Sequence, residues 1–207
     1  MFTIKKKHHV AVLVSAIALS LTGCGNDDDA QPSDVRTASD GELFNDADVE
    51  FATAMIPHHA QALEMVDLTV GRDLSPEVQA LAAQIREAQA PEVEQMSDWL
   101  TSWDEPVPET SLNHANAEGE GHDMEGMDSD EMPGMMSADE MDELEAAPDA
   151  EFEAMFLEMM IDHHQGAVDM AETEQSDGEY AEAVTLAEAI ETSQTAEIET
   201  MEGLLGS

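Results

Sequence analysis

The sequence predicts an all-α protein, a four-helix bundle made of two duplicated helical hairpins. Three observations support this prediction. The chain contains an internal repeat at a fixed offset, its apolar residues recur with helical spacing, and it lacks the alternation typical of strands. Two hairpins related by duplication bury four apolar stripes most simply as a bundle.

The repeat aligns each position of the first half with the position 105 residues further on, without a gap. Identities at this offset extend over about 50 residues, too many to result from composition alone. The first-half positions with an identical partner include Phe51, Met55, Ile56, His58, His59, Ala62, Met65, Leu81, Ala82, Ile85, Gln89, Glu92, Met96 and Leu100. We therefore expect both halves to share one fold.

Each repeat contains two predicted helices. In the first helix one stripe has a 4-3-4-3 spacing and consists of Phe51, Met55, His58, Ala62 and Met65. This helix should begin near Asp46 to Asp48, where acidic residues suit the helix dipole, and end before Gly71. His59 and its repeat partner His164 lie at the edge of the stripe, which makes them weaker ligand candidates, because such an edge can simply face solvent.

The second helix should begin after Ser75, a serine cap followed by proline at the first helical position. Its stripe comprises Val78, Leu81, Ile85, Gln89, Glu92, Met96 and Trp99. Pro91 is expected to interrupt and kink this helix, because proline has no N–H and crowds the preceding turn. Ala196 occupies the equivalent position of the second repeat, whose helix can run straight.

The N-terminus resembles a bacterial lipoprotein signal. Lys5 to Lys7 precede an apolar run of about a dozen residues, too short to span a bilayer, which ends at Thr22-Gly23-Cys24. In that pattern Cys24 becomes the lipidated first residue of the mature chain; the alternative is an ordinary signal peptide followed by a chance cysteine. Because Cys24 is the only cysteine, the mature chain has no disulfide framework and no thiolate metal site.

The predicted organisation has five parts. They are a lipoprotein signal peptide (1–23), a flexible tether (24–45), the first helical-hairpin repeat (46–103), an acidic Met/His-rich linker (104–139) and the second helical-hairpin repeat (140–207). The two repeats together form one bundle domain, and the linker is expected to be disordered without a ligand. It has few apolar side chains other than methionine, so the bundle should survive its removal.

The mature chain is strongly acidic. All three lysines lie in the signal peptide, which leaves Arg36, Arg72 and Arg86 against 48 acidic residues. Such a surface repels nucleic acid and anionic lipid and concentrates cations. Most of these carboxylates are expected to form a solvated face, because scattered carboxylates make only weak, nonselective metal sites.

Polar residues interrupt the apolar stripes. His58 lies between Met55 and Ala62, and the second helix carries Gln89 and Glu92 among its apolar positions. A buried polar group without a partner costs a few kcal/mol, so each needs one. A metal ion bound by imidazole and thioether would satisfy them. The predicted ligands are His58, His59, Met55, Met65, His163, His164, Met160 and Met170, supported by Gln89, Glu92, Gln194 and Glu197.

An alternative is that the histidines are ordinary core residues, bonded to Glu92 or Gln89, and that the methionines fill gaps. The donor set itself favours copper, particularly Cu(I), over magnesium or calcium. A di-iron site is the rival, but the sequence has no Glu-x-x-His motif. The linker offers a second, soft-metal set, or a plain spacer, with His114, His122, Met124, Met127, Met132, Met135 and Met136.

The motifs Met55-Ile56-Pro57-His58-His59 and Met160-Ile161-Asp162-His163-His164, each followed by Ala and then Met, resemble the bacterial family called domain of unknown function 305. The stretch from Met132 to Ser137 is also similar to that family. The resemblance implies a ferritin-like bundle, an extracytoplasmic location and, for some members, copper binding and resistance. Leu204 stands where the first repeat has Trp99, so the two bundle ends should pack unequally.

Three functions follow from these patterns. The leading one is a surface protein that buffers, sequesters or hands on copper, with its membrane contact through Cys24. The others are a metal-dependent oxidase of the ferritin-like class and an acidic structural bundle without metal. The sequence lacks a convergent acid–base or nucleophile set, which favours binding over catalysis.

Overall fold

The computed structural model describes residues 35–39, 41–110 and 132–206, all within one unit, Ser33–Ser207. Within these residues the elements are β1 (Arg36–Thr37), β2 (Leu43–Phe44), α1 (Asp46–Asp67), α2 (Pro76–Ser102), α3 (Ala138–Ala146), α4 (Asp149–Asp177) and α5 (Ala181–Leu205). The prediction of an all-α bundle is confirmed. The predicted signal peptide and Cys24 lie outside the described residues. No described helix is both long enough and apolar enough to cross a membrane.

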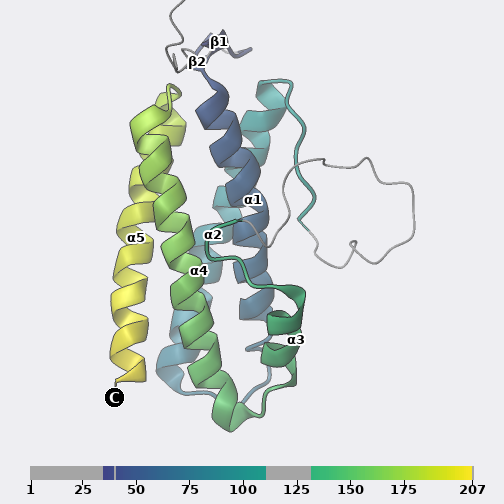
Figure 1. Cartoon of the computed structure of the whole chain (residues 1–207), viewed down its shortest axis with the longest axis vertical. Coiled ribbons are helices and arrows are strands. Elements are labelled where there is room, and N and C mark those ends of the chain that lie inside the picture. Colours follow the sequence, from purple (N-terminus) through teal and green to yellow (C-terminus); the bar gives the residue numbers. More distant parts are fainter. Residues whose placement is uncertain (1–34, 40, 111–131, 207) are drawn as a thin grey trace, which may run out of the picture. The chain divides into compact units, whose positions relative to one another are not determined.

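Two helical hairpins form the bundle, as the repeat predicts. Helix α1 packs on α2, α4 packs on α5, and the hairpins meet through α1 and α4 (Figure 1). Asp48, near the start of α1, accepts a hydrogen bond from the backbone N–H of Glu179, just after α4. Arg72, just after α1, pairs with Asp149 at the start of α4. Helices α1 and α4 are therefore antiparallel.

Capping residues set where the helices begin. The Asn45 side chain accepts hydrogen bonds from the backbone N–H groups of Ala47 and Asp48. The Asp48 carboxylate accepts one from the backbone N–H of Asn45, which completes a capping box at the start of α1. Ser75 caps α2, and Pro76 is its first residue. Both predicted starts are confirmed.

Prolines do not interrupt the helices. Pro91 lies inside α2, which is continuous, so the predicted interruption is wrong. Pro57 lies inside α1 in the same way. A proline removes one hydrogen bond of the ladder, and packing of the turns on both sides of it holds the helix together.

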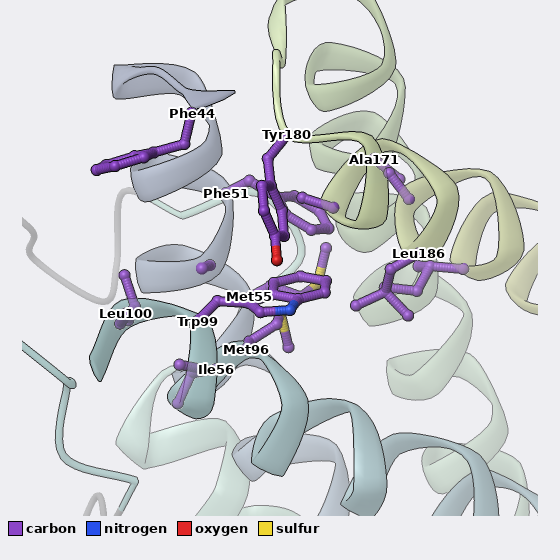
Figure 2. Close-up of a cluster of buried hydrophobic side chains, with 14 of the residues drawn as sticks. Phe44, Phe51, Met55, Ile56, Met96, Trp99, Leu100, Ala171, Tyr180 and Leu186 are labelled. Carbon is purple, nitrogen blue, oxygen red and sulfur yellow. The ribbon is translucent and has the colours of Figure 1, made fainter. Parts of the chain in front are cut away.

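The core consists of two separate apolar clusters. The first lies near the start of α1 and includes Phe51, Met55, Trp99 and Tyr180 (Figure 2). The second lies toward the other end of α1 and contains Met65 along with the residues Phe152, Phe156, Leu157 and Met201. The histidines of both repeats belong to neither cluster, and they lie on α1 and α4 between the members of the two.

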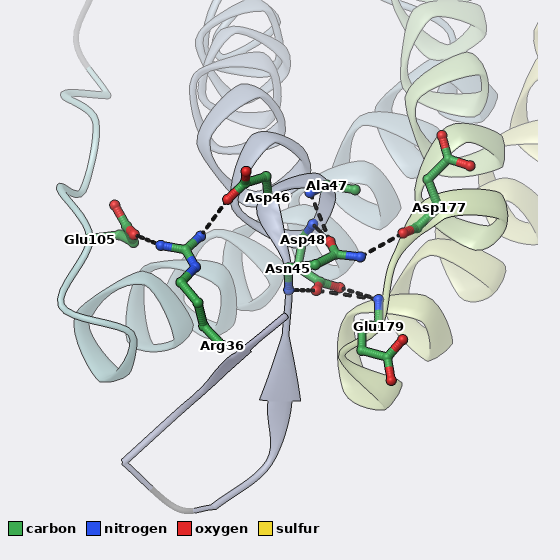
Figure 3. A network of polar contacts seen from close by, with 8 residues as sticks. All are labelled: Arg36, Asn45, Asp46, Ala47, Asp48, Glu105, Asp177 and Glu179. Carbon is green, nitrogen blue, oxygen red and sulfur yellow. Dashed lines mark hydrogen bonds and ion pairs between the residues drawn. The ribbon is translucent and has the colours of Figure 1, made fainter. Parts of the chain in front are cut away.

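The last part of the predicted flexible tether is ordered. Arg36–Thr37 and Leu43–Phe44 pair as two short antiparallel strands, which the sequence did not predict because two residues are too few to show alternation. Phe44 is buried and stacks on Trp103, with ring centroids 4.8 Å apart. Arg36 pairs with Glu105 and Asp46 (Figure 3). This hairpin covers one end of the bundle.

The C-terminal end of the predicted linker also belongs to the bundle. Met136 is buried in the second cluster, and α3 begins at Ala138, two residues before the predicted boundary at 140. At this end the linker therefore contributes to the core through Met136. Residues 111–131, which include His114, His122, Met124 and Met127, lie outside the described residues.

Candidate metal centre

The two repeats meet at a pair of histidines. His58 of α1 and His163 of α4 occupy equivalent positions of the repeats, and their rings face each other with centroids 3.8 Å apart and planes tilted by 38°. Neither side chain is exposed to solvent. Because α1 and α4 are antiparallel, equivalent residues near the middle of each helix come together at their crossing. We call His58, His59, His163 and His164 the histidine layer.

The second histidine of each motif pairs with a glutamate of its own hairpin. His59 Nε2 lies 2.7 Å from Glu92, and His164 Nε2 lies 2.7 Å from Glu197. The alternative that His59 and His164 face solvent is wrong, because both are fully buried. The helices α2 and α5 cover the edge of each stripe, which a single-helix pattern does not show.

In all four histidines the same ring nitrogen lacks a hydrogen-bond partner among the described residues. The Nδ1 atoms of His58, His59, His163 and His164 are buried and have no hydrogen-bond partner among the described residues. Three of the four Nε2 atoms do have one: Glu92, Glu197 and, for His58, the carbonyl oxygen of Pro133 at 3.2 Å. A neutral imidazole that donates from Nε2 keeps a lone pair on Nδ1.

Burial keeps the central pair neutral. It lowers the pKa of His58 to about 3, assisted by the neighbouring His59. Burial, together with His58, also lowers the pKa of His163 well below its ordinary value. A neutral ring can bind a metal ion without first releasing a proton.

The supporting polar residues lie where the stripes predict. Gln89 and Gln194 are buried, and Gln89 has no hydrogen-bond partner for either side-chain amide atom among the described residues. Glu92 and Glu197 are mostly buried, with side-chain exposures of 17% and 16%. Each glutamate thus bonds the second histidine of its motif.

The predicted methionine ligands flank the layer. Met55 and Met170 pack with the first apolar cluster, and Met65 and Met160 pack with the second. They therefore contribute to the apolar core on each side of the histidines. Among the linker methionines, Met132 and Met135 are half-buried and Met136 is buried.

The histidine layer brings the imidazole rings of His58 and His163 together as a pair. No group of three or more His, Cys, Asp or Glu side chains is placed to hold a metal ion within the described part of the chain. Soft monovalent ions suit imidazole and thioether donors. The unpartnered Nδ1 atoms and the adjoining methionines fit such an ion better than a hard, oxygen-seeking one.

Comparison with known proteins identifies the family of the chain. The family model described as domain of unknown function DUF305 matches residues 48–205. This protein belongs to the DUF305 family. Among curated proteins, none matches this DUF305 chain.

Solved structures match most of this DUF305 protein. A DUF305 fragment from Deinococcus radiodurans is 33% identical, with a TM-score of 0.64, over 83% of this chain and 99% of its own. A DUF305 protein from Streptomyces coelicolor, described as secreted, is 32% identical, with a TM-score of 0.65, over 77% of this chain and 92% of its own. CopM in its Cu(II)-bound form is 31% identical, with a TM-score of 0.60, over 77% of this chain and 95% of its own. CopM has also been solved with Cu(I) and with silver.

Three residues that the sequence analysis did not predict as part of the site contact the histidine layer of this DUF305 chain or the segment beside it. Pro133 accepts a hydrogen bond from His58, Gln61 bonds the backbone of Met136, and Gly166 lies against Pro133. No sequence signal distinguished Gln61 or Gly166. They are equivalent positions of the two repeats, but most other positions of these helices also differ between the repeats.

Proposed function

We propose that this protein binds copper in its histidine layer and buffers it or passes it on outside the cytoplasm. The observation that carries the proposal is the set of four buried Nδ1 atoms without hydrogen-bond partners. A buried lone pair without a partner costs free energy, and coordination of a soft metal ion would compensate for it. Copper is the cargo of this site.

The hydrogen bonds around the layer support coordination through Nδ1. Metal-binding histidines commonly donate their other N–H to a carboxylate or a carbonyl, which fixes the tautomer and raises ligand basicity. His59 and His164 have this arrangement with Glu92 and Glu197, and His58 has it with Pro133. CopM, which is similar over most of the chain, binds Cu(I), Cu(II) and silver.

The test is competition with a chromogenic Cu(I) chelator under anaerobic conditions. His58→Ala combined with His163→Ala should weaken tight binding by at least about 100-fold, since losing even outer-shell partners costs 10- to 100-fold in metal affinity. His114→Ala combined with His122→Ala is the matched control and should keep tight binding. Unchanged tight binding in the first double variant would show that the layer is an ordinary polar core.

A metal-dependent oxidase is the second candidate. The relatives solved with both Cu(I) and Cu(II) motivate it, because a site that accepts both oxidation states can turn over between them. An oxygen-consumption trace of the Cu(I)-loaded protein separates the two functions. A steady rate proportional to protein concentration would favour the oxidase.

We also propose that Cys24 carries a lipid that holds the protein at the outer side of the cell membrane. The order of basic, apolar and small residues before Cys24 supports this proposal, and one relative is described as secreted. Cys24→Ser should release the protein from the membrane fraction or leave it unprocessed. If the variant fractionates as the natural protein does, the anchor lies elsewhere.

A further inference from the structure

A short segment before α3 covers the histidine layer. Residues Met132–Met136, here called the strap, run from Met132 to the buried Met136 and cross the junction of α1 and α4. The chain leading into α3 crosses α1 in Figure 1. The Pro133 carbonyl contacts His58 on the α1 side, and Gly134 lies against the backbone of His163 on the α4 side. The strap therefore touches both members of the central pair.

Gly166 makes room for the strap on α4. A Cβ atom at this position would overlap the carbonyl group of Pro133. The strap glycine fits equally tightly, since a Cβ on Gly134 would lie 2.5 Å from the Asp162 carbonyl oxygen, and its φ of 75° is one that glycine favours. The two backbones approach each other here as only glycines permit.

Gln61 fastens the strap on α1. Its side-chain Nε2 donates to the Met136 carbonyl oxygen at 2.7 Å, and its Oε1 accepts from the Met136 N–H at 2.8 Å. This bidentate contact satisfies the backbone of Met136 as a neighbouring strand would. Gln61 is itself buried, so breaking the contact would leave polar groups without partners.

The two repeats contact the strap differently at one equivalent position. Gln61 and Gly166 are equivalent by the offset of 105, yet one fastens the strap and the other gives it space. A single segment lying across a two-fold arrangement cannot contact both helices in the same way. A glutamine on α1 and a glycine on α4 suit this asymmetric cover.

The outer surface of the strap is open, with Pro133 exposed and Gly134 and Met135 half-buried. Beneath it, His58 and His163 have no exposed surface. We propose that the strap is the gate of the histidine layer: it lifts from Gly166 to admit a metal ion to His58 and His163. When it closes, the Pro133 carbonyl holds the His58 N–H and leaves Nδ1 available. This inference rests on the proposed function for its ligand, but the cover itself is independent of it.

The decisive variant is Gly166→Ala, with Gly203→Ala as the matched control. Alanine favours a helix over glycine, so both changes should leave the helices intact. A Cβ on Gly203 meets no other atom, whereas a Cβ on Gly166 displaces the strap. Gln61→Ala is the second variant, because it unfastens the strap without crowding it.

The first readout uses the metal-free full chain. Diethyl pyrocarbonate modifies accessible histidines, and mass spectrometry locates the sites. His58 and His163 should react about tenfold faster in Gly166→Ala and Gln61→Ala than in the natural protein or in Gly203→Ala, the change expected when one or two hydrogen bonds that close the gate are lost. If Gly166→Ala loses its helical circular dichroism, Gln61→Ala alone decides the result.

The second readout is the rate at which Cu(I) passes from a chromogenic chelator to the protein. Opening the gate should speed capture and release by about the same factor, tenfold, and change the equilibrium affinity far less. The proposal would be overturned if Gly166→Ala and Gln61→Ala took up Cu(I) at the rate of the natural protein and their histidines stayed protected from diethyl pyrocarbonate. The metal ion would then enter past Glu92 and Glu197, whose side chains are partly exposed. If neither the natural protein nor any variant binds Cu(I) but the modification rates differ as expected, the proposed copper function is wrong, while the strap still covers the histidine layer.

Discussion

At the scale of single residues, two carboxyl groups meet where α1 and the end of α4 come together. Asp48 is fully buried and accepts hydrogen bonds from the backbone N–H groups of Asn45, Glu179 and Tyr180. Glu174 is buried beside it. Burial, together with Asp48 and then Asp177, raises the pKa of Glu174 to about 9, so this side chain keeps its proton at neutral pH.

This environment predicts that stability falls as the pH rises. The folded-state pKa of Glu174 lies above its ordinary value of 4.5, so the folded protein holds a proton that the unfolded chain has lost. The contribution to stability is fully present below about pH 4.5 and is lost as the pH approaches 9. Glu174→Gln should flatten this dependence, by at most about 1.4 kcal/mol per pH unit.

Urea unfolding between about pH 5 and 9 measures the effect. Glu172→Gln, an exposed position of the same helix, is the control and should keep the natural dependence. Parallel curves for Glu174→Gln and the natural protein would mean that Glu174 is ionised in the folded state.

The sequence predicted which residue types form the site, but not which residues form hydrogen bonds with one another. Histidine in an apolar stripe signals a buried polar group, and that inference from His58 and His163 agrees with their burial. The carboxylate partners could not be assigned, because which histidine Glu92 reaches depends on how α2 rotates against α1. Pro133 could not be foreseen either, since a backbone carbonyl carries no sequence signal.

At the scale of elements, the N-terminus of α1 has the most elaborate cap. Asn45 accepts from Ala47 N–H at 2.8 Å and from Asp48 N–H at 3.2 Å, and it donates to the Asp177 carbonyl oxygen at 2.7 Å. The side chain thus caps one helix and joins it to the end of another (Figure 3). The cap of α2 is simpler, a single bond from Val78 N–H to Ser75 at 3.3 Å.

We therefore expect Asn45→Ala to lower the free energy of unfolding by about 2 kcal/mol, the upper part of the range for a lost cap, because a bond between helices is lost with it. Ser75→Ala should cost about 0.5 kcal/mol, the lower end of that range. Urea titration of both variants measures the two values. Equal losses would show that the link to Asp177 contributes nothing.

Elements with strong periodicity were predictable, and those without it were not. Helix α1 begins within the predicted range and α2 begins at the predicted serine cap, because acidic first turns, side-chain caps and apolar spacing are local signals. The strands β1 and β2 and the strap owe their order to contacts with distant residues, Trp103 for Phe44 and Gln61 for Met136. Composition alone assigned all of these segments to tether and linker.

At the scale of the whole molecule, we expect two segments of the linker to have different roles. Replacing residues 111–131 by a Gly/Ser segment of equal length should change the melting temperature by less than about 2 °C, because the loop length is unchanged. The replacement removes His114, His122, Met124 and Met127, so weak copper binding should decrease while tight binding remains.

Replacing 132–137 in the same way is the contrasting variant. It removes Met136 from the core and the bonds of Gln61, so the melting temperature should fall by about 4–10 °C. Calorimetry and Cu(I) titration of both replacements measure these outcomes. A large loss of stability on replacing 111–131 would show that this segment packs on the bundle.

The meeting of His58 and His163 has a consequence for how the site responds to dilution. Each repeat supplies one ring, so a single repeat would need a second molecule to complete the pair, and the fraction of complete sites would depend on protein concentration. Joining both halves in one chain makes assembly unimolecular, with an effective concentration that dilution does not change. The paired site is therefore complete at any protein concentration.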